Sequence, residues 1–508
     1  MFKGHPKGLI PAALANMGER FGFYTMMAIL VLFLQAKFGL SGTNAGYIYS
    51  GFYFSIYILA LVGGIIADRI QNFKGTILVG LITMAVGYVI MAIPTPTPVS
   101  SVPLYLTISI VGLFVIAFGN GLFKGNLQAL VGQMYDSPKY EKMRDSGFSL
   151  FYAFINVGAI FAPFTAVGIR NWWLNTNGLS YDASLPEQCH TYLNGLMNEE
   201  SIGRFKLYAD KASDGSVIDL TEFSNNYLNV FNTGFHYAFG IAIIAMIISF
   251  VIYLKNMKGF PDVKGSAKGG AIEITDEIKM EAKEVAQRMY ALLAVFGVVI
   301  FFWFSFHQNG LTLTMFAKDY TLLKFGSWNF SAEIFQSMNP FFVVFLTPIL
   351  VGLFGWLRKR NIEPSTPKKI AIGMGIASLA FVVMMLGSLN VPLFSSISPS
   401  HGGIPLDDTQ KVTPFLLLGA YFILTVAELF ISPMGISFVS KVAPPQYQGL
   451  MQGGWLGATA LGNGLLFIGA ILYETIPIWM TWSIFVIATA ISMFTIMFMV
   501  KWLERVAK

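Results

Sequence analysis

The sequence predicts an all-α membrane protein whose twelve transmembrane helices form two halves of six, and three observations lead to this prediction. The 508 residues are 55% hydrophobic and only 12% charged, against about 25% charged residues in an average soluble domain. Their mean hydropathy is +0.62. Twelve apolar segments provide the ~20 residues that a helix needs to cross a bilayer. A lipid bilayer is therefore the expected environment of the chain.

The twelve predicted spans are separated by connections that are mostly short. They cover residues 10–36, 46–67, 75–93, 104–133, 146–168, 234–254, 289–316, 333–356, 370–390, 414–440, 449–472 and 477–500. Several are longer than a ~30 Å hydrocarbon core requires, so we expect those helices to tilt or protrude. Two connections are long, the polar segment 169–233 and the Lys/Glu-rich segment 255–288.

These long connections and the positions of Lys and Arg predict domains and orientation. Segment 255–288 is the expected cytoplasmic linker between an N-terminal bundle, residues 1–254 with the extracytoplasmic loop 169–233, and a C-terminal bundle, residues 289–508. With both termini cytoplasmic, the cytoplasmic connections hold 23 of the 33 Lys and Arg residues. This bias predicts a multi-pass protein of the cytoplasmic (inner) membrane. It also explains the net charge of +6 without nucleic-acid binding.

Four fully charged side chains lie deep inside the predicted spans: Glu19, Arg20, Lys124 and Glu428. An ionised group at the centre of a bilayer costs at least ~2.5–3.5 kcal/mol, so such residues usually serve a function. The four come from three separate spans and balance in charge. They predict an internal, water-accessible site, as in the major facilitator superfamily, where two six-helix halves rock around a site near the midplane.

Other classes of membrane protein fit these charges less well. A channel usually carries a ring of like charges, whereas these are paired and asymmetric. An enzyme needs a nucleophile with its base or a set of metal ligands, but the candidates are scattered along the chain: Cys189, His190, His236 and His307. We therefore expect no enzymatic activity, no metal and no cofactor.

The first span concentrates polar residues on one helical turn. Asn16, Glu19 and Arg20 stand at i, i+3 and i+4, so they share a face. Glu19 lies about nine residues, ~14 Å, into the span and therefore near mid-membrane. Burial and Arg20 shift the pKa of a carboxyl group in opposite directions, which suits a proton carrier. A self-neutralising pair that only joins helices is the structural alternative.

Further polar motifs follow along the chain. Tyr49, Tyr53 and Tyr57 recur every four residues, and three phenol groups in lipid favour a cavity face over plain packing. Other motifs are GNGLFKGN at 119–126, FYAFINVG at 151–158, NP at 339–340, ELFISP at 428–433 and the segment that contains Trp455. The glycines around Lys124 lack the GK[ST] of a phosphate loop, which excludes a nucleotide site there.

In their order and spacing these motifs, with Glu19-Arg20-Phe21-x-x-Tyr24 and the GGxxADR turn ending at Arg69, resemble the proton-dependent oligopeptide transporter (POT) family. The resemblance implies import of di- and tripeptides with protons. It implies that Lys124 faces the peptide carboxylate, that Glu428 faces the amino terminus, and that these two residues pair to close the cytoplasmic side. The remaining implied site residues are Tyr24, Tyr57, Tyr152, Asn156 and Asn339, with Trp303 and Trp455 shaping side-chain pockets. A monomer is the expected functional unit.

Four positions depart from the family pattern, one of them Gly125, where the family has a Pro after the Lys of span four. The other three concern charge. The first Glu of its ExxER motif is Asn16, an Arg further along the helix is Met27, and an acidic position on span seven is His307. The resemblance implies that the Arg and the acid form a buried ion pair in the family. Because Met27 and His307 replace both members, neither position leaves a buried charge without a partner. Proton coupling then rests on Glu19 and Arg20, with His307 as a second titrating group or a packing residue. The alternative function is transport of another peptide-like or anionic solute with altered or absent proton coupling.

Segment 169–233 matches the family least. We expect ordinary extracytoplasmic structure there, with a cap over the entrance or a docking loop as alternatives.

Overall fold

The computed structural model describes residues 4–140, 143–261, 282–326, 328–444 and 447–507. Twelve of its helical segments are long and apolar enough to cross a membrane, and each overlaps one predicted span. The predicted fold class is confirmed. The centre of the predicted linker lies outside the described residues.

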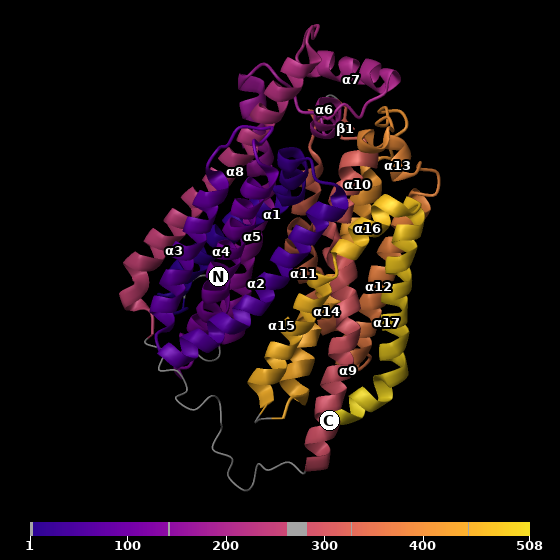
Figure 1. Cartoon of the computed structure of the whole chain (residues 1–508). Helices are drawn as coiled ribbons and strands as arrows, with labels where there is room; N and C mark the ends of the chain where they lie inside the picture. Colours follow the sequence, from indigo (N-terminus) through magenta and orange to yellow (C-terminus); the bar gives the residue numbers. More distant parts are fainter. Residues whose placement is uncertain (1–3, 141–142, 262–281, 327, 445–446, 508) are drawn as a thin grey trace.

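Six long helices pack together to form the first half of the molecule (Figure 1). They are α1 (Leu9–Phe38), α2 (Gly42–Ile70), α3 (Phe73–Ala92), α4 (Val102–Gln133), α5 (Arg144–Thr176) and α8 (Leu220–Asn256), the last followed by η2 (Met257–Gly259). The turn between the first two is fixed by Gly39, which is left-handed at φ 65°, and by Ser41, whose side chain caps α2.

Three of the six spans in the second half are interrupted. The broken spans are α9 (Ala282–Phe306), η4 (His307–Gly310) and α10 (Thr312–Tyr320); η5 (Ala332–Ser337) and α11 (Met338–Lys359); and α15 (Gln448–Gly464) and α16 (Phe467–Thr475). The continuous ones are α12 (Thr366–Gly387), α14 (Pro414–Val442) and α17 (Ile478–Val506). Interrupted membrane helices often mark a binding site, because their free backbone groups need a polar, protein-lined environment.

The connections add short elements at the end of the molecule opposite the linker. Two-residue strands β1 (Lys324–Phe325) and β2 (Trp328–Asn329) pair antiparallel, and α13 (Phe394–Ile397) and η6 (Pro399–His401) lie in the connection before α14. The predicted loop 169–233 needs correction, because α5 continues to residue 176 and α8 begins at residue 220. Between them stand two helices that we call the cap, α6 (Leu185–Leu193) and α7 (Glu199–Ala212).

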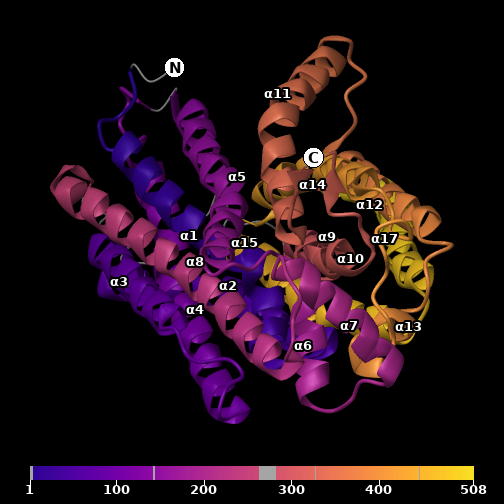
Figure 2. The same cartoon turned by 90° about the horizontal axis from the view of Figure 1, so that it is seen from above.

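The cap reaches from the first half onto the second (Figures 1 and 2). Glu187 of α6 accepts a hydrogen bond from Ser398 at 2.5 Å and lies 3.7 Å from the ammonium of Lys318. Arg204 of α7 pairs with Asp407 at 3.2 Å. Segment 169–233 therefore contains a cap that bridges the two halves, in keeping with one of the two alternatives to ordinary extracytoplasmic structure.

The two halves meet at the cap end and diverge toward the linker end (Figure 1). At the cap end, the carboxylate of Glu474 in α16 accepts hydrogen bonds from two backbone N–H groups at the start of α2, those of Gly42 at 2.5 Å and Thr43 at 3.1 Å. A carboxylate is favoured at this place because the first amides of a helix lack partners and carry partial positive charge.

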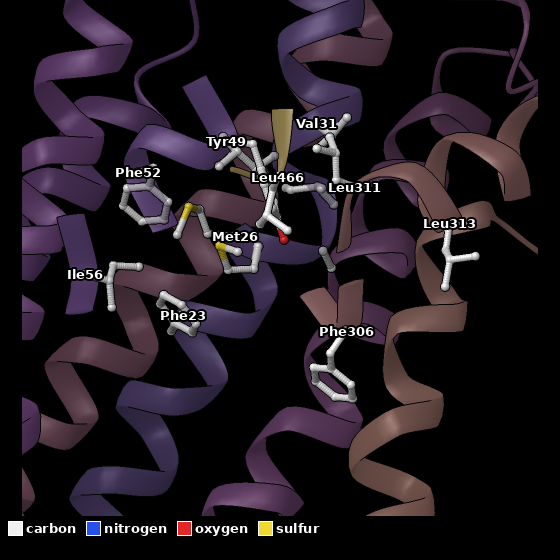
Figure 3. Close-up of a cluster of buried hydrophobic side chains, with 14 of the residues drawn as sticks. Phe23, Met26, Val31, Tyr49, Phe52, Ile56, Phe306, Leu311, Leu313 and Leu466 are labelled. Atoms are coloured by element: carbon white, nitrogen blue, oxygen red, sulfur yellow. The ribbon is translucent and has the colours of Figure 1, made fainter. Parts of the chain in front are cut away.

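Apolar side chains complete the closure beneath these polar contacts. Figure 3 shows Val31 and Tyr49 of the first half beside Leu311 and Leu466 of the second. All four are buried. The approach is close enough that a Cβ atom on Gly310 would lie 2.0 Å from the Tyr49 hydroxyl. The structure is therefore a conformation sealed on the cap side.

Candidate substrate site and family

A cavity of about 300 Å³ lies between the two halves, below the apolar closure. Its walls come from the first, second, fourth and fifth spans of one half and from spans seven, eight and ten of the other. Ten of the twelve predicted site residues line it: Arg20, Tyr24, Tyr57, Lys124, Tyr152, Asn156, Trp303, His307, Asn339 and Glu428. Among the described residues, no group of three or more His, Cys, Asp or Glu side chains is placed to hold a metal ion.

Glu19 stands directly behind the cavity wall. Its carboxylate is fully buried and accepts two hydrogen bonds from the neighbouring Arg20, at 2.5 Å from Nε and 2.6 Å from Nη2. Asn120 of α4 donates a third, at 2.7 Å. Adjacent residues point in different directions on a helix, so the long Arg20 side chain must fold back to reach its neighbour. Arg20 also lines the cavity. A negatively charged group of a ligand can therefore compete with Glu19 for the Arg20 guanidinium.

Lys124 projects from α4 onto an aromatic wall. Its ammonium lies 4.9 Å from the ring centre of Tyr57, which is within the range of a cation–π contact. The wall continues from Tyr57 to Tyr53 at 5.9 Å and from Tyr53 to His307 at 4.7 Å. Within the described residues Lys124 has no ion-pair partner, so its charge is available to a ligand.

Glu428 faces the cavity from α14, in the other half. One carboxylate oxygen accepts a hydrogen bond of 2.8 Å from Asn339, which also contacts the Thr425 hydroxyl at 3.1 Å. Asn339 therefore holds the carboxylate in place without neutralising it. Besides Arg20, which is paired with Glu19, the cavity thus presents Lys124 on one half and Glu428 on the other, and in this conformation no ion pair joins them among the described residues. The predicted Lys124–Glu428 gating pair is therefore not formed among the described residues of this conformation.

Two predicted residues do not line the cavity in this conformation. Glu19 lies behind Arg20. The indole of Trp455 is buried against Gly435, where a Cβ atom would lie only 1.8 Å from the ring. Met27 and His307, which depart from the family pattern, both line the cavity. Both departures therefore lie at the same cavity.

A buried ion pair that the sequence did not predict joins the two halves. Arg170 of α5 pairs with Glu333 of η5, both side chains are fully buried, and Arg170 also donates to the Ser331 hydroxyl at 2.8 Å. The ring of Tyr181 stacks 4.1 Å from the guanidinium. Arg170 follows the predicted end of its span by two residues, and Glu333 is the first residue of another. Charges at span boundaries are usually solvated, but here α5 extends beyond the predicted span, and Phe231 and Phe235 of α8 also pack over the Arg170 guanidinium.

The Arg170–Glu333 pair yields a stability prediction. Arg170→Met should lower the free energy of unfolding by about 3–5 kcal/mol, because it strands a buried carboxylate. Thermal unfolding of the purified protein in detergent measures this loss. Adding Glu333→Leu should recover much of it, and Arg204→Ala, which breaks an exposed pair, should cost no more than about 1 kcal/mol. Unchanged stability in Arg170→Met would show that the pair does not hold the halves together.

Comparisons with known proteins agree with the motifs. A family model described as the POT family matches residues 74–269 and 262–480. The chain is 28% identical to the peptide transporter YePEPT of Yersinia enterocolitica over 477 residues, which cover 91% of this chain and 87% of that protein. It is 28% identical to a di-/tripeptide transporter of Lactococcus lactis over 500 residues, covering 91% of this chain and 89% of the relative.

A solved structure shares the architecture. The crystal structure of peptide transporter POT in complex with sulfate superimposes with a TM-score of 0.74 and 22% identity, covering 100% of this chain and 96% of the other. At this identity the likeness establishes the fold, two six-helix halves of the major facilitator superfamily type. The relatives are transporters and not enzymes. On its motifs, its fold and the family match over most of its length, the chain belongs to the POT family of multi-pass membrane transporters.

Proposed function

We propose that the protein imports di- and tripeptides together with protons by alternating access, acting as a monomer in the cytoplasmic membrane with both termini in the cytoplasm. The observation that carries this proposal is that Lys124 and Glu428 face one cavity from opposite halves and that neither has an ion-pair partner among the described residues. A peptide is a zwitterion, so its carboxylate matches Lys124 and its ammonium matches Glu428. Relatives named as peptide transporters support the same substrate class.

Binding at both ends of the peptide would couple capture to movement. A ligand shifts a conformational equilibrium only by its differential affinity for the two states. A peptide held at its two ends by Lys124 and Glu428 would keep these residues from pairing with each other, which would favour closure at the cap end and opening at the linker end. After release, the two residues would pair directly and close the empty carrier. Tyr24, Tyr57, Tyr152, Asn156 and Asn339 would contact the peptide between its ends, and Trp303 and Trp455 would shape the side-chain pockets.

Protons would bind at the Glu19–Arg20 pair, behind the cavity wall. When Glu19 is protonated, Arg20 loses its counter-charge and becomes available to a substrate carboxylate on the cavity side. Asn120 holds Glu19 in either protonation state, because its amide donates to a carboxyl or a carboxylate oxygen. Within the cavity His307 is the alternative titrating group. Asn16 removes the further acid that the family pattern places on this turn.

The Lys124 site makes a prediction about the substrate carboxylate. In competition with labelled di-alanine, the unmodified peptide should bind at least about tenfold better than its C-terminal amide, since a charge-assisted contact contributes roughly 1.5–3 kcal/mol. Lys124→Ala should lower affinity and reduce this ratio to near one. Lys139→Ala, a change outside the cavity, is the matched control. A ratio that survives in Lys124→Ala would place the carboxylate elsewhere.

A further inference from the structure

His307 offers the cavity one nitrogen that the protein does not use. The ring forms a single hydrogen bond in the described part of the chain, from Nδ1 to Oδ1 of Asn463 at 2.5 Å. A carbonyl oxygen only accepts, so Nδ1 carries the hydrogen. In the neutral ring Nε2 then carries a lone pair and is an acceptor.

The ring is held in this orientation on several sides. Trp303 stacks on it at 4.9 Å and an interplanar angle of 19°, and Tyr53 lies 4.7 Å away. Phe306 meets it edge-on at 5.2 Å. The residue is 6% exposed and lines the cavity. A fixed acceptor is therefore surrounded by flat apolar surfaces at the substrate site.

His236 in the same protein is a useful contrast. Its Nδ1 is likewise occupied, by the carbonyl oxygen of Met91 at 2.7 Å, but its Nε2 is buried, finds no hydrogen-bond partner in the described part of the chain, and does not line the cavity. No substrate reaches that nitrogen. Water can solvate Nε2 of His307 while the cavity is empty, but a bound substrate that expels this water must replace its hydrogen bond, or binding weakens.

We propose that His307 is a specificity-determining residue, whose Nε2 accepts a hydrogen bond from an N–H or O–H group on a substrate side chain. The inference rests on the proposed function and deepens it by naming a substrate class, peptides with a donor-bearing side chain. Tyrosine fits best among them. Its ring packs on the aromatic wall of Trp303 and Tyr53, and its hydroxyl supplies the donor. A side chain of equal shape without the donor leaves Nε2 unsatisfied.

Matched peptides that differ by one donor test this directly. Ala-Tyr against Ala-Phe, Ala-Thr against Ala-Val, and the same pairs in reversed order compete with labelled di-alanine for exchange in proteoliposomes. Exchange needs no proton gradient, so the result is independent of coupling. In the wild type the donor peptide of at least one pair should inhibit roughly threefold to tenfold better, the ratio expected for one net hydrogen bond.

The variants locate the acceptor. His307→Phe should bring the ratio to near one, whereas His236→Phe, the same chemical change outside the cavity, should preserve it. Asn463→Leu releases Nδ1 and should also reduce the ratio, which provides a second test where His307→Phe does not fold. Equal inhibition within every pair in the wild type, preference for the peptides without donors, or an unchanged ratio in His307→Phe would overturn the inference. Absence of di-alanine exchange in the wild type would instead contradict the proposed function.

Discussion

Glu428→Gln is expected to reduce uptake of di-alanine by about thirtyfold or more, because removing one partner of a desolvated charge pair costs about 2–5 kcal/mol. The amide keeps the size of the side chain and can still accept the hydrogen bond from Asn339, so the protein should fold. What disappears is the negative charge opposite the peptide ammonium. Initial uptake rates in proteoliposomes containing equal amounts of folded protein measure the loss.

Glu222→Gln is the matched control, since it makes the same change on an exposed residue of α8 far from the cavity. It should transport at the wild-type rate. Thermal unfolding of both variants separates a lost charge from a lost fold. Wild-type uptake by Glu428→Gln would remove Glu428 from the site and leave the substrate ammonium without the partner that we assign to it.

The second large effect concerns energy coupling. Glu19→Gln should eliminate accumulation of peptide against its gradient while exchange of labelled for unlabelled di-alanine continues. The amide imitates a permanently protonated carboxyl group and can still accept from Asn120. Arg20 then stays without a counter-charge, so some loss of thermal stability is also expected. The measurement is the ratio of internal to external peptide at steady state under an imposed pH gradient.

Glu222→Gln is again the control, and it should accumulate peptide as the wild type does. If Glu19→Gln still concentrates peptide, the proton is carried by another group. His307, the other titratable side chain that we assign to coupling, is then the next position to change. A variant that neither accumulates nor exchanges peptide would instead assign Glu19 and Arg20 to binding or structure.

The twelve spans could be predicted from sequence because each is a long apolar run, and the bilayer sets its minimum length. The cap could not, because α6 and α7 are short and no apolar run marks them. Their place over the second half depends on contacts such as Arg204–Asp407, between residues 203 positions apart in the chain. For the same reason the boundaries of α5 and α8 were underestimated, since both helices continue beyond the apolar part of their sequences.

The site was predicted where a charge stands alone in an apolar segment. Glu428 and Lys124 are conspicuous for this reason, and the structure brings both to one cavity. The partners that orient the site are neutral amides, and an amide within a helix gives no comparable signal. The sequence therefore predicted no role for Asn120 or Asn463, although Asn120 is hydrogen-bonded to Glu19 and Asn463 to His307. Arg170 was missed because it stands at a span boundary, where a charge is ordinarily solvated.

Peptide import driven by protons is tested most directly with the purified protein in proteoliposomes. Uptake of labelled di-alanine is followed with the exterior acidic, with equal pH on both sides, and with protein-free vesicles. We predict accumulation above the external concentration only with the acidic exterior, equilibration without the gradient, and no uptake by empty vesicles. Uptake that equilibrates identically with and without the gradient would contradict proton coupling, and no uptake above that of empty vesicles would contradict peptide transport.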